Sequence, residues 1–248
     1  MGHPADRAAL PGHLMAVAIS DVARHQIVRR GPSCQDGGVR SKAGTYGGLS
    51  LAQRQTDRRR QLVDAALDIW GEQGWAAVSM RGVCAHARLT DRYFYESFAD
   101  RDALLVAVWD QVRDETIARI LRAIHSKLGE GPMTQLRAAI AELVEHLGDD
   151  PRGAALLFGE HTGSAALEQR RQQTLQQFTD LLVALAQPYL RPGADPVELR
   201  MSTLIGIGGF VELINAWRAG ILATDAGHII DHTARLGEVL AAQYLAGQ

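Results

Sequence analysis

Apolar positions recur at the spacing of an α-helix along most of the chain, and no stretch alternates in the manner of a β-strand. Gly74 can end the first amphipathic run, because glycine readily adopts the conformation found just after a helix. Ser79 and Thr90 can then cap two short helices, near 80–85 and 91–97. Two caps eleven residues apart leave room for one short helix and a turn, which predicts a helix-turn-helix. The first run is marked by Leu62, Val63, Ala66, Ile69 and Trp70.

Proline, glycine and acidic capping residues divide the rest of the chain into further helices. Asp100 can cap a long helix over about 101–128, which would connect the front of the molecule to its back. Later helix starts are expected at Pro132, Asp150-Pro151, Ser164, Asp195-Pro196 and Asp225. The pattern predicts an all-α protein of about nine helices, in which an N-terminal three-helix helix-turn-helix domain is followed by a larger helical domain.

The first part of the chain differs in composition from the remainder. Residues 1–53 are rich in Gly, Ser, Arg and Pro and show no sustained period, so we expect a disordered basic extension there. The helix-turn-helix domain is expected over 54–100, with Asp57-Arg58-Arg59-Arg60 as a polar turn before its first helix. The second helical domain is expected over 101–248.

Charge is unevenly distributed along the 248 residues, whose net charge is −2. The first sixty residues hold ten basic against four acidic side chains, a net of +6, which leaves −8 for the remainder. A basic front and an acidic back suit a protein that contacts DNA at one end only. The alternative is that the basic segment is a solvated tail without a partner.

The two cysteines do not indicate a disulfide framework. Cys34 lies in the expected extension and Cys84 in an apolar position of the first short helix, so a reducing, cytoplasmic setting is the simpler interpretation. The N-terminus lacks the continuous apolar segment of a signal peptide. The longest apolar run, 201–211, is far shorter than the ~20 residues that span a bilayer, so no membrane partner is expected.

An ordered set of positions between residues 58 and 105 carries more information than any single motif. Its members are Leu62, Val63, Ala66, Ile69, Trp70, Gly74, Trp75, Val78, Ser79, Met80, Arg81, Val83, Cys84, Ala85, Ala87, Leu89, Thr90, Tyr95, Phe98, Arg101, Asp102, Ala103, Leu104 and Leu105. This set, which covers roughly a fifth of the chain, resembles the DNA-binding domain of the TetR/AcrR family of one-component bacterial repressors.

Two positions depart from the family pattern. The turn between the short helices usually carries glycine, and here it is Arg88, which must adopt a left-handed conformation or reshape the turn. The residue two positions before the recognition tyrosine is usually small, and here it is Tyr93. A site preference therefore cannot be transferred from relatives.

The second short helix is the expected recognition helix, because the N-terminal residues of a helix in the major groove point at the bases. Arg92 is the main candidate for a base or phosphate contact, whereas Asp91 is expected to cap the helix rather than contact DNA. The resemblance implies phosphate contacts for Tyr95 and Arg101. Phe94 and Phe98 share one face and are expected in the core. The full set of candidate DNA contacts is Arg58, Ser79, Arg81, Thr90, Arg92, Tyr93, Tyr95 and Arg101.

Ser79 and Arg81 are included because they begin the preceding helix, where free N–H groups favour phosphate. Arg58 is included because it precedes the first helix, where family arms meet the DNA backbone. The alternative for Arg58 and its two arginine neighbours is a solvated turn.

The segment 197–221 is apolar on nearly every side, so it must be covered on nearly every side. Gly206, Gly208 and Gly209 lower its helix propensity by roughly 1 kcal/mol each, which is reasonable where another helix packs closely. The resemblance implies a homodimer in which the last two helices of each protomer form a four-helix interface. The alternative is that both helices complete a monomer core.

A ligand pocket is expected between the long connecting helix and its neighbours. Its apolar candidates are Trp109, Phe158, Phe178 and Trp217, with His146, His161, Glu212 and Asn215 as polar candidates. Each has a purely structural alternative, because isolated aromatic residues usually belong to the core and a histidine can be structural. Glu212 is suggestive because a carboxylate in an apolar helix needs a partner, which could be a ligand or Arg218.

No nucleophile elbow, glycine-rich phosphate loop or metal-spaced cluster is present in the sequence, so no enzyme activity, cofactor or metal is expected. The resemblance, together with the order of the helices, implies a ligand-responsive transcriptional regulator, most simply a repressor, that binds a palindromic operator as a homodimer. A small apolar effector would release it by tilting the 101–128 helix. The alternatives are an activator, and a helical small-molecule carrier or enzyme whose DNA-binding domain is not functional.

Overall fold

The computed structural model describes residues 50–159, 161 and 163–246. The predicted extension therefore lies outside the described residues up to position 49, as does Cys34. Residues 51–53 already belong to the first described helix, so the predicted boundary at residue 53 is too late.

The first described helix, α2, spans Leu51–Gln73 and begins earlier than the sequence analysis predicted. Ser50 starts it with a capping box: its Oγ accepts from the Gln53 N–H at 3.1 Å, and Gln53 Oε1 accepts from the Ser50 N–H at 2.7 Å. The predicted arginine-rich turn at 57–60 is thus wrong, because those residues lie inside α2. A helix whose first turns are polar carries no apolar period, and only its cap marks the start.

The helix-turn-helix forms as predicted. After the 3-10 helix η1 (Trp75–Ala77), α3 spans Met80–Ala87 and α4 spans Asp91–Ser97. Ser79 caps α3 by accepting from the Gly82 N–H at 3.2 Å. Thr90 occupies the N-cap position of α4, but its side chain makes no capping hydrogen bond, so the predicted cap is wrong in that respect. Arg88 takes the left-handed conformation that the missing glycine required, with φ 54° and ψ 38°.

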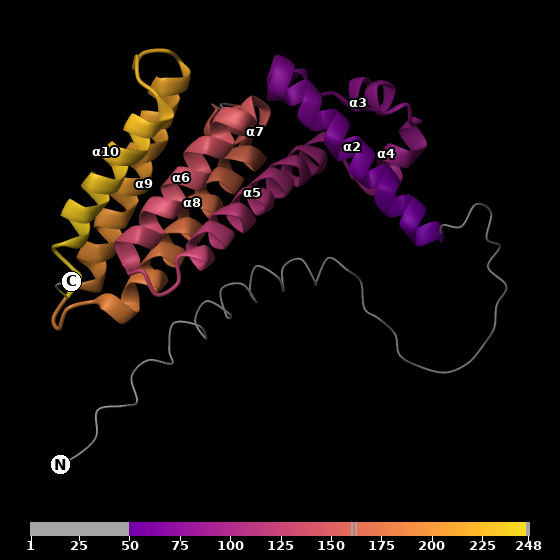
Figure 1. Cartoon of the computed structure of the whole chain (residues 1–248). Coiled ribbons are helices and arrows are strands. Elements are labelled where there is room, and N and C mark those ends of the chain that lie inside the picture. The colour runs from indigo at the N-terminus through magenta and orange to yellow at the C-terminus, as the bar shows by residue number, and fades with distance from the viewer. Residues whose placement is uncertain (1–49, 160, 162, 247–248) are drawn as a thin grey trace, which may run out of the picture.

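Six further α-helices, α5 to α10, complete the fold (Figure 1). Within the described ranges the chain forms nine α-helices, two 3-10 helices and no strand beyond an isolated bridge between Leu190 and Leu245. The predicted all-α fold is confirmed. None of these helices is both long and apolar enough to cross a membrane. The remaining helices are α5 (Arg101–Ser126), α6 (Pro132–Asp149), α7 (Pro151–Phe158), α8 (Ala165–Ala186), α9 (Pro196–Arg218) and α10 (Ala226–Ala241), with η2 at Gln187–Tyr189.

Two separate cores define the two ends of the molecule. The front core joins α2, α3 and α4 to the first half of α5, and Leu156 of α7 and Leu167 of α8 complete it. The back core lies among α6, α7, α9 and α10, around Val144, Ile214 and Ile229. Helix α5 therefore belongs to the front core at one end and to the back helices at the other (Figure 1).

Helix α7 also connects the two ends of the molecule. A Cβ atom at Gly71 of α2 would lie 2.6 Å from the Cβ atom of Arg152, so only glycine permits this close approach. The Arg152 guanidinium forms an ion pair with Asp68 of α2, whose other oxygen lies 3.4 Å from His86 Nε2 on α3. Any movement of α7 must therefore displace α2 or break this contact.

Candidate DNA interface and effector cavity

Helix α4 presents one face to solvent because its other face is anchored. Phe94 and Phe98 are buried in the front core, as predicted, and their rings pack against each other with centroids 5.7 Å apart. Tyr95 is then left 61% exposed, and the Arg92 side chain is 83% exposed. Arg92 Nε donates to Glu96 Oε1 at 2.9 Å, a surface pair of at most about 1 kcal/mol that a phosphate can displace.

Two arginines of α2 hold α4 in place. The Arg58 guanidinium lies 4.3 Å from the centroid of the Tyr93 ring and 3.8 Å from Glu96. Arg59 stacks over Phe98 at 4.2 Å and donates to the Ser97 carbonyl at 2.6 Å. Arg58 therefore does not lie in a solvated turn but helps to position α4. Tyr93 is half-buried beneath the Arg58 guanidinium and does not point freely into solvent.

Arg101, which the resemblance implies as a phosphate contact, makes hydrogen bonds within the protein. Its guanidinium donates to the carbonyls of Val78 at 2.5 Å and Trp75 at 2.7 Å, and it lies 5.3 Å from the Trp75 ring. Trp75 is the first residue of η1 and Val78 is its C-cap, so Arg101 joins α5 to the segment before α3. These acceptors lie more than twenty positions earlier in the sequence. The phosphate contact that the resemblance implies for Arg101 stays a prediction.

The remaining candidates lie on the surface around α3 and the turn before α4. Ser79, Arg81 and Thr90 are all exposed. Asp91, expected to cap α4, instead lies in its first turn and faces the Cys84 thiol, whose pKa is raised by burial and by that carboxylate. The buried thiol therefore stays protonated near neutral pH.

A cavity of about 770 Å³ lies between α5, α6, α7, α8 and α9. Most of its wall is apolar, and its size matches that of small-molecule sites. Five of the predicted pocket residues line it, together with the polar candidate Asn215. The five are Trp109, Phe158, His161, Phe178 and Glu212.

Two predicted pocket residues lie elsewhere. Trp217 packs in the back core, and its Nε1 donates to the Thr224 carbonyl at 2.9 Å. His146 does not line the cavity. It interacts electrostatically with Glu115: burial raises the pKa of Glu115, and His146 partly offsets this rise. The predicted Arg218 partner for Glu212 is also wrong: Arg218 Nη1 donates to the Ala154 carbonyl at 3.0 Å, and burial lowers its pKa.

His161 joins the cavity to the DNA-binding unit. It is 3% exposed, and its ring lies edge-on to Trp70 of α2 at 5.6 Å and to Trp109 of α5 at 5.0 Å. Neither imidazole nitrogen makes a hydrogen bond of normal geometry. Burial lowers its pKa, although the Leu156 backbone and Glu168 act in the opposite direction, so the ring is neutral near pH ~7.

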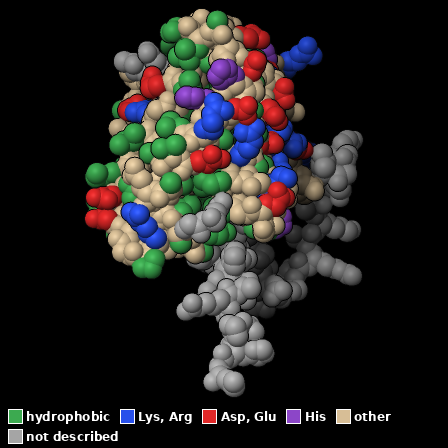
Figure 2. All heavy atoms as spheres, turned by 60° about the vertical axis from the view of Figure 1, so that its left-hand side comes forward, with side chains coloured by type: hydrophobic (Ala, Val, Ile, Leu, Met, Phe, Trp, Pro, Cys, Tyr) green, Lys and Arg blue, Asp and Glu red, His purple; other side chains and the backbone are tan. Residues whose placement is uncertain are grey.

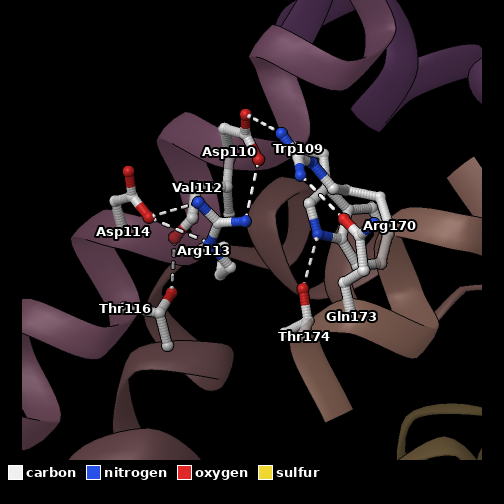
Figure 3. Close-up of polar contacts among 9 residues, drawn as sticks. All are labelled: Trp109, Asp110, Val112, Arg113, Asp114, Thr116, Arg170, Gln173 and Thr174. Atoms are coloured by element: carbon white, nitrogen blue, oxygen red, sulfur yellow. Dashed lines mark hydrogen bonds and ion pairs between the residues drawn. The ribbon is translucent and has the colours of Figure 1, made fainter. Parts of the chain in front are cut away.

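A buried ion-pair network at the cavity wall was missed from the sequence (Figure 3). Asp110 is 2% exposed and lies between Arg113, at 2.8 Å, and Arg170, at 2.8 Å. Arg113 also contacts Asp114 at 2.7 Å. The i, i+3 spacing of Asp110 and Arg113 on one helix was a signal for this pair, but Arg170 comes from α8, and only the folded packing brings it there.

Helices α9 and α10 lie at the end of the molecule farthest from α4 (Figure 1). They leave apolar side chains exposed, and the face turned forward in Figure 2 shows hydrophobic side chains interspersed with charged ones. On α9, Ile205 is 70% exposed, and on α10, Val239 is 63% exposed. Space is open beside Gly208 and Gly209, where a Cβ atom would meet nothing within 4 Å. We call this surface the α9/α10 face; its exposed apolar residues are Val197, Met201, Leu204, Ile205, Leu236 and Val239.

Among the described residues, no three His, Cys, Asp or Glu side chains gather in a way that could hold a metal ion. The site thus consists of an outward-facing short helix at one end of the molecule and a cavity among the helices of the other end.

The comparisons with known proteins agree. Residues 62–108 match the model for bacterial regulatory proteins of the tetR family, which confirms the resemblance seen in the sequence. A transcriptional regulator from Rhodococcus sp. Rha1 is similar in fold, with a TM-score of 0.61, 19% identity, and coverage of 77% of this chain and 99% of that one.

Two neighbours have ligands. The transcriptional regulator FadR from Bacillus subtilis, solved with stearoyl-CoA, matches with a TM-score of 0.58 at 18% identity over 74% of this chain and 97% of that one. The multidrug binding protein EbrR, solved with imidazole, matches with a TM-score of 0.54 at 24% identity over 72% of this chain and 94% of that one. At these identities the shared property is the fold.

Proposed function

We propose that the protein is a ligand-responsive transcriptional repressor that binds a palindromic operator as a homodimer and is released by a small, largely apolar effector. The observation that carries the proposal is the presentation of α4, which is anchored by Phe94 and Phe98 while Arg92 and Tyr95 face solvent. A helix held in this way can lie in the major groove with its first residues at the bases.

The DNA contacts divide into two kinds. Arg92, at the start of α4, can reach base edges or phosphate, and the Tyr95 hydroxyl can donate to a phosphate oxygen. Ser79 and Arg81 flank the N-terminus of α3, where backbone N–H groups also favour phosphate. Arg58 and Arg101 support this surface by positioning α4 and η1, and they add positive charge near it.

The second copy is proposed on the α9/α10 face. Two α9 helices and two α10 helices would cover the apolar side chains that one chain leaves exposed, and the open space beside Gly209 permits close helix packing. A two-fold axis through this face would present two α4 helices to two half-sites of opposite direction. Such a regulator acts on DNA in the cytoplasm.

Coupling between cavity and DNA follows from shared side chains. Trp109 belongs to the front core and also lines the cavity, and His161 touches both Trp109 and Trp70 of α2. An effector that moves these side chains apart, or draws them closer together, would shift α5 and α7 relative to α2. The ensemble would then favour a different separation of the two α4 helices, and DNA affinity would fall.

The test is a gel-shift titration on the protein's own upstream DNA over a salt series. We expect Arg92→Ala and Tyr95→Phe each to weaken binding by about 1–3 kcal/mol, with the Tyr95→Phe loss uniform across sequences. The matched control is Arg122→Ala, which removes an exposed arginine of α5 away from the DNA end. If both α4 variants bind as the wild type does at every salt concentration, α4 does not contact DNA.

A further inference from the structure

The cationic side chains at the cavity wall are all paired with carboxylates. Arg113 lines the wall, but it is held by Asp110 and Asp114, and the neighbouring Arg170 is held by Asp110 as well (Figure 3). These four side chains are neutral as a group. The guanidinium of Arg113 is thus already neutralised before any ligand arrives.

The second cation of the wall is also paired. Arg171 contacts Glu168 at 2.7 Å, and this contact lowers the pKa of Glu168 and raises that of Arg171. His161 adds no positive charge, since its buried ring is neutral. Among the described residues that line the cavity, no unpaired cation remains for an anionic head group such as that of an acyl-CoA.

Glu212 is the exception. Its carboxylate lines the cavity, and it makes no hydrogen bond or ion pair with any residue that the structure describes. Its side chain is exposed to solvent at the cavity mouth rather than enclosed by other side chains. Phe158, Phe178 and Phe210 line the same space, and aromatic faces attract cations.

We infer that the cavity selects an apolar, aromatic or alkyl effector that carries one positive charge, with Glu212 as the counter-ion that determines this specificity. The inference rests on the proposed function only in calling the ligand an effector. The lining arginines are already paired, so they offer no free cation to an anionic ligand. When their ion-pair partners Asp110, Asp114 and Arg170 are counted with the lining residues, Glu212 leaves a net charge of −1 around the cavity. The surrounding apolar surface supplies most of the binding free energy and the charge supplies the selectivity.

The experiment uses two probes of nearly equal size and shape, tetraphenylphosphonium and tetraphenylborate, in calorimetric titrations of the full chain. We expect the phosphonium ion to bind about tenfold more tightly than the borate ion, as for a partly screened ion pair. Because the two ions differ in hydration, the reference is Glu212→Gln. That variant should lose the preference, chiefly by weakening phosphonium binding about tenfold.

Glu198→Gln is the matched control, because it makes the same substitution on the same helix outside the cavity lining and should leave both affinities unchanged. The inference is overturned if borate binds as tightly as phosphonium, or if Glu212→Gln keeps the wild-type ratio. It is also overturned if Glu212→Gln changes only the dimer dissociation constant in sedimentation, which would place the carboxylate in the α9/α10 face.

DNA binding by the same preparations separates this inference from the proposed function. A protein that binds an operator without preferring the cation refutes only the ligand class. A protein that prefers the cation and binds no DNA refutes only the regulator.

Discussion

Helices α2 and α9 have the same length, twenty-three residues, yet they are completed in different ways. Helix α2 has a polar mean composition and still buries six side chains in the front core. Helix α9 is mostly apolar and buries only Leu199 and Ile214. The front core is therefore complete within one chain, whereas α9 borders a cavity and leaves an apolar face uncovered. In the proposed function, a ligand fills the cavity and a second copy covers the face.

The largest effect is expected at the anchor of α4. Phe94→Ala should reduce the free energy of unfolding by about 3–5 kcal/mol, because the ring is fully buried and its removal leaves a cavity in the front core. Urea unfolding at fixed protein concentration measures this. Tyr95→Ala, one position along and exposed, should cost less than about 1 kcal/mol, and equal losses would show that α4 is not anchored as described.

A smaller effect is expected on the α9/α10 face. Ile205→Asp should raise the dimer dissociation constant about 100-fold, because the two-fold axis buries a carboxylate from each copy in an apolar interface. Sedimentation equilibrium provides the measurement. Leu128→Asp changes an exposed leucine at the end of α5 and should leave the constant unchanged. A wild-type monomer, or an Ile205→Asp dimer as tight as the wild type, contradicts this interface.

The smallest effect concerns the histidine that joins the two units. The folded-state pKa of His161 lies below its unfolded value, so the unfolded state binds the proton more readily. Stability is then complete above pH ~6.5 and declines as the pH falls through that value toward the folded pKa. Between pH ~7.5 and ~5.5, the free energy of unfolding of the wild type should fall by at most about 1 kcal/mol more than that of His161→Phe. Urea midpoints measure both values. Equal losses would mean that His161 titrates as if unfolded.

The sequence predicted the front unit well because its signals are local. Ser79 and Asp100 cap the helices where expected, and the spacing of Phe94 and Phe98 identified the buried face of α4. Arg88 was expected to adopt a left-handed conformation from a single missing glycine. The start of α2 was missed because its first turns are polar, and Ser50 with Gln53 was the only local signal.

The cavity was predicted only in part, for a different reason. Apolar periodicity correctly indicated Phe158 and Phe178 as cavity residues. Periodicity cannot tell which helix covers which face, and Trp217, which was predicted to line the cavity, packs in the back core instead. Partners far apart in sequence, such as Arg101 with the Trp75 carbonyl and Arg170 with Asp110, depend on the packing of whole helices. Such contacts carry no periodic signal that a single sequence can reveal.

Two outward-facing α4 helices are proposed to read a duplex, and selection of bound fragments from random double-stranded DNA tests this proposal. We expect enrichment of an inverted repeat whose half-sites lie about one helical turn, or a multiple of it, apart, and we expect Arg92→Ala to lose the enrichment. A wild-type pool that shows no enriched inverted repeat would contradict the claim and would favour a helical carrier of small molecules.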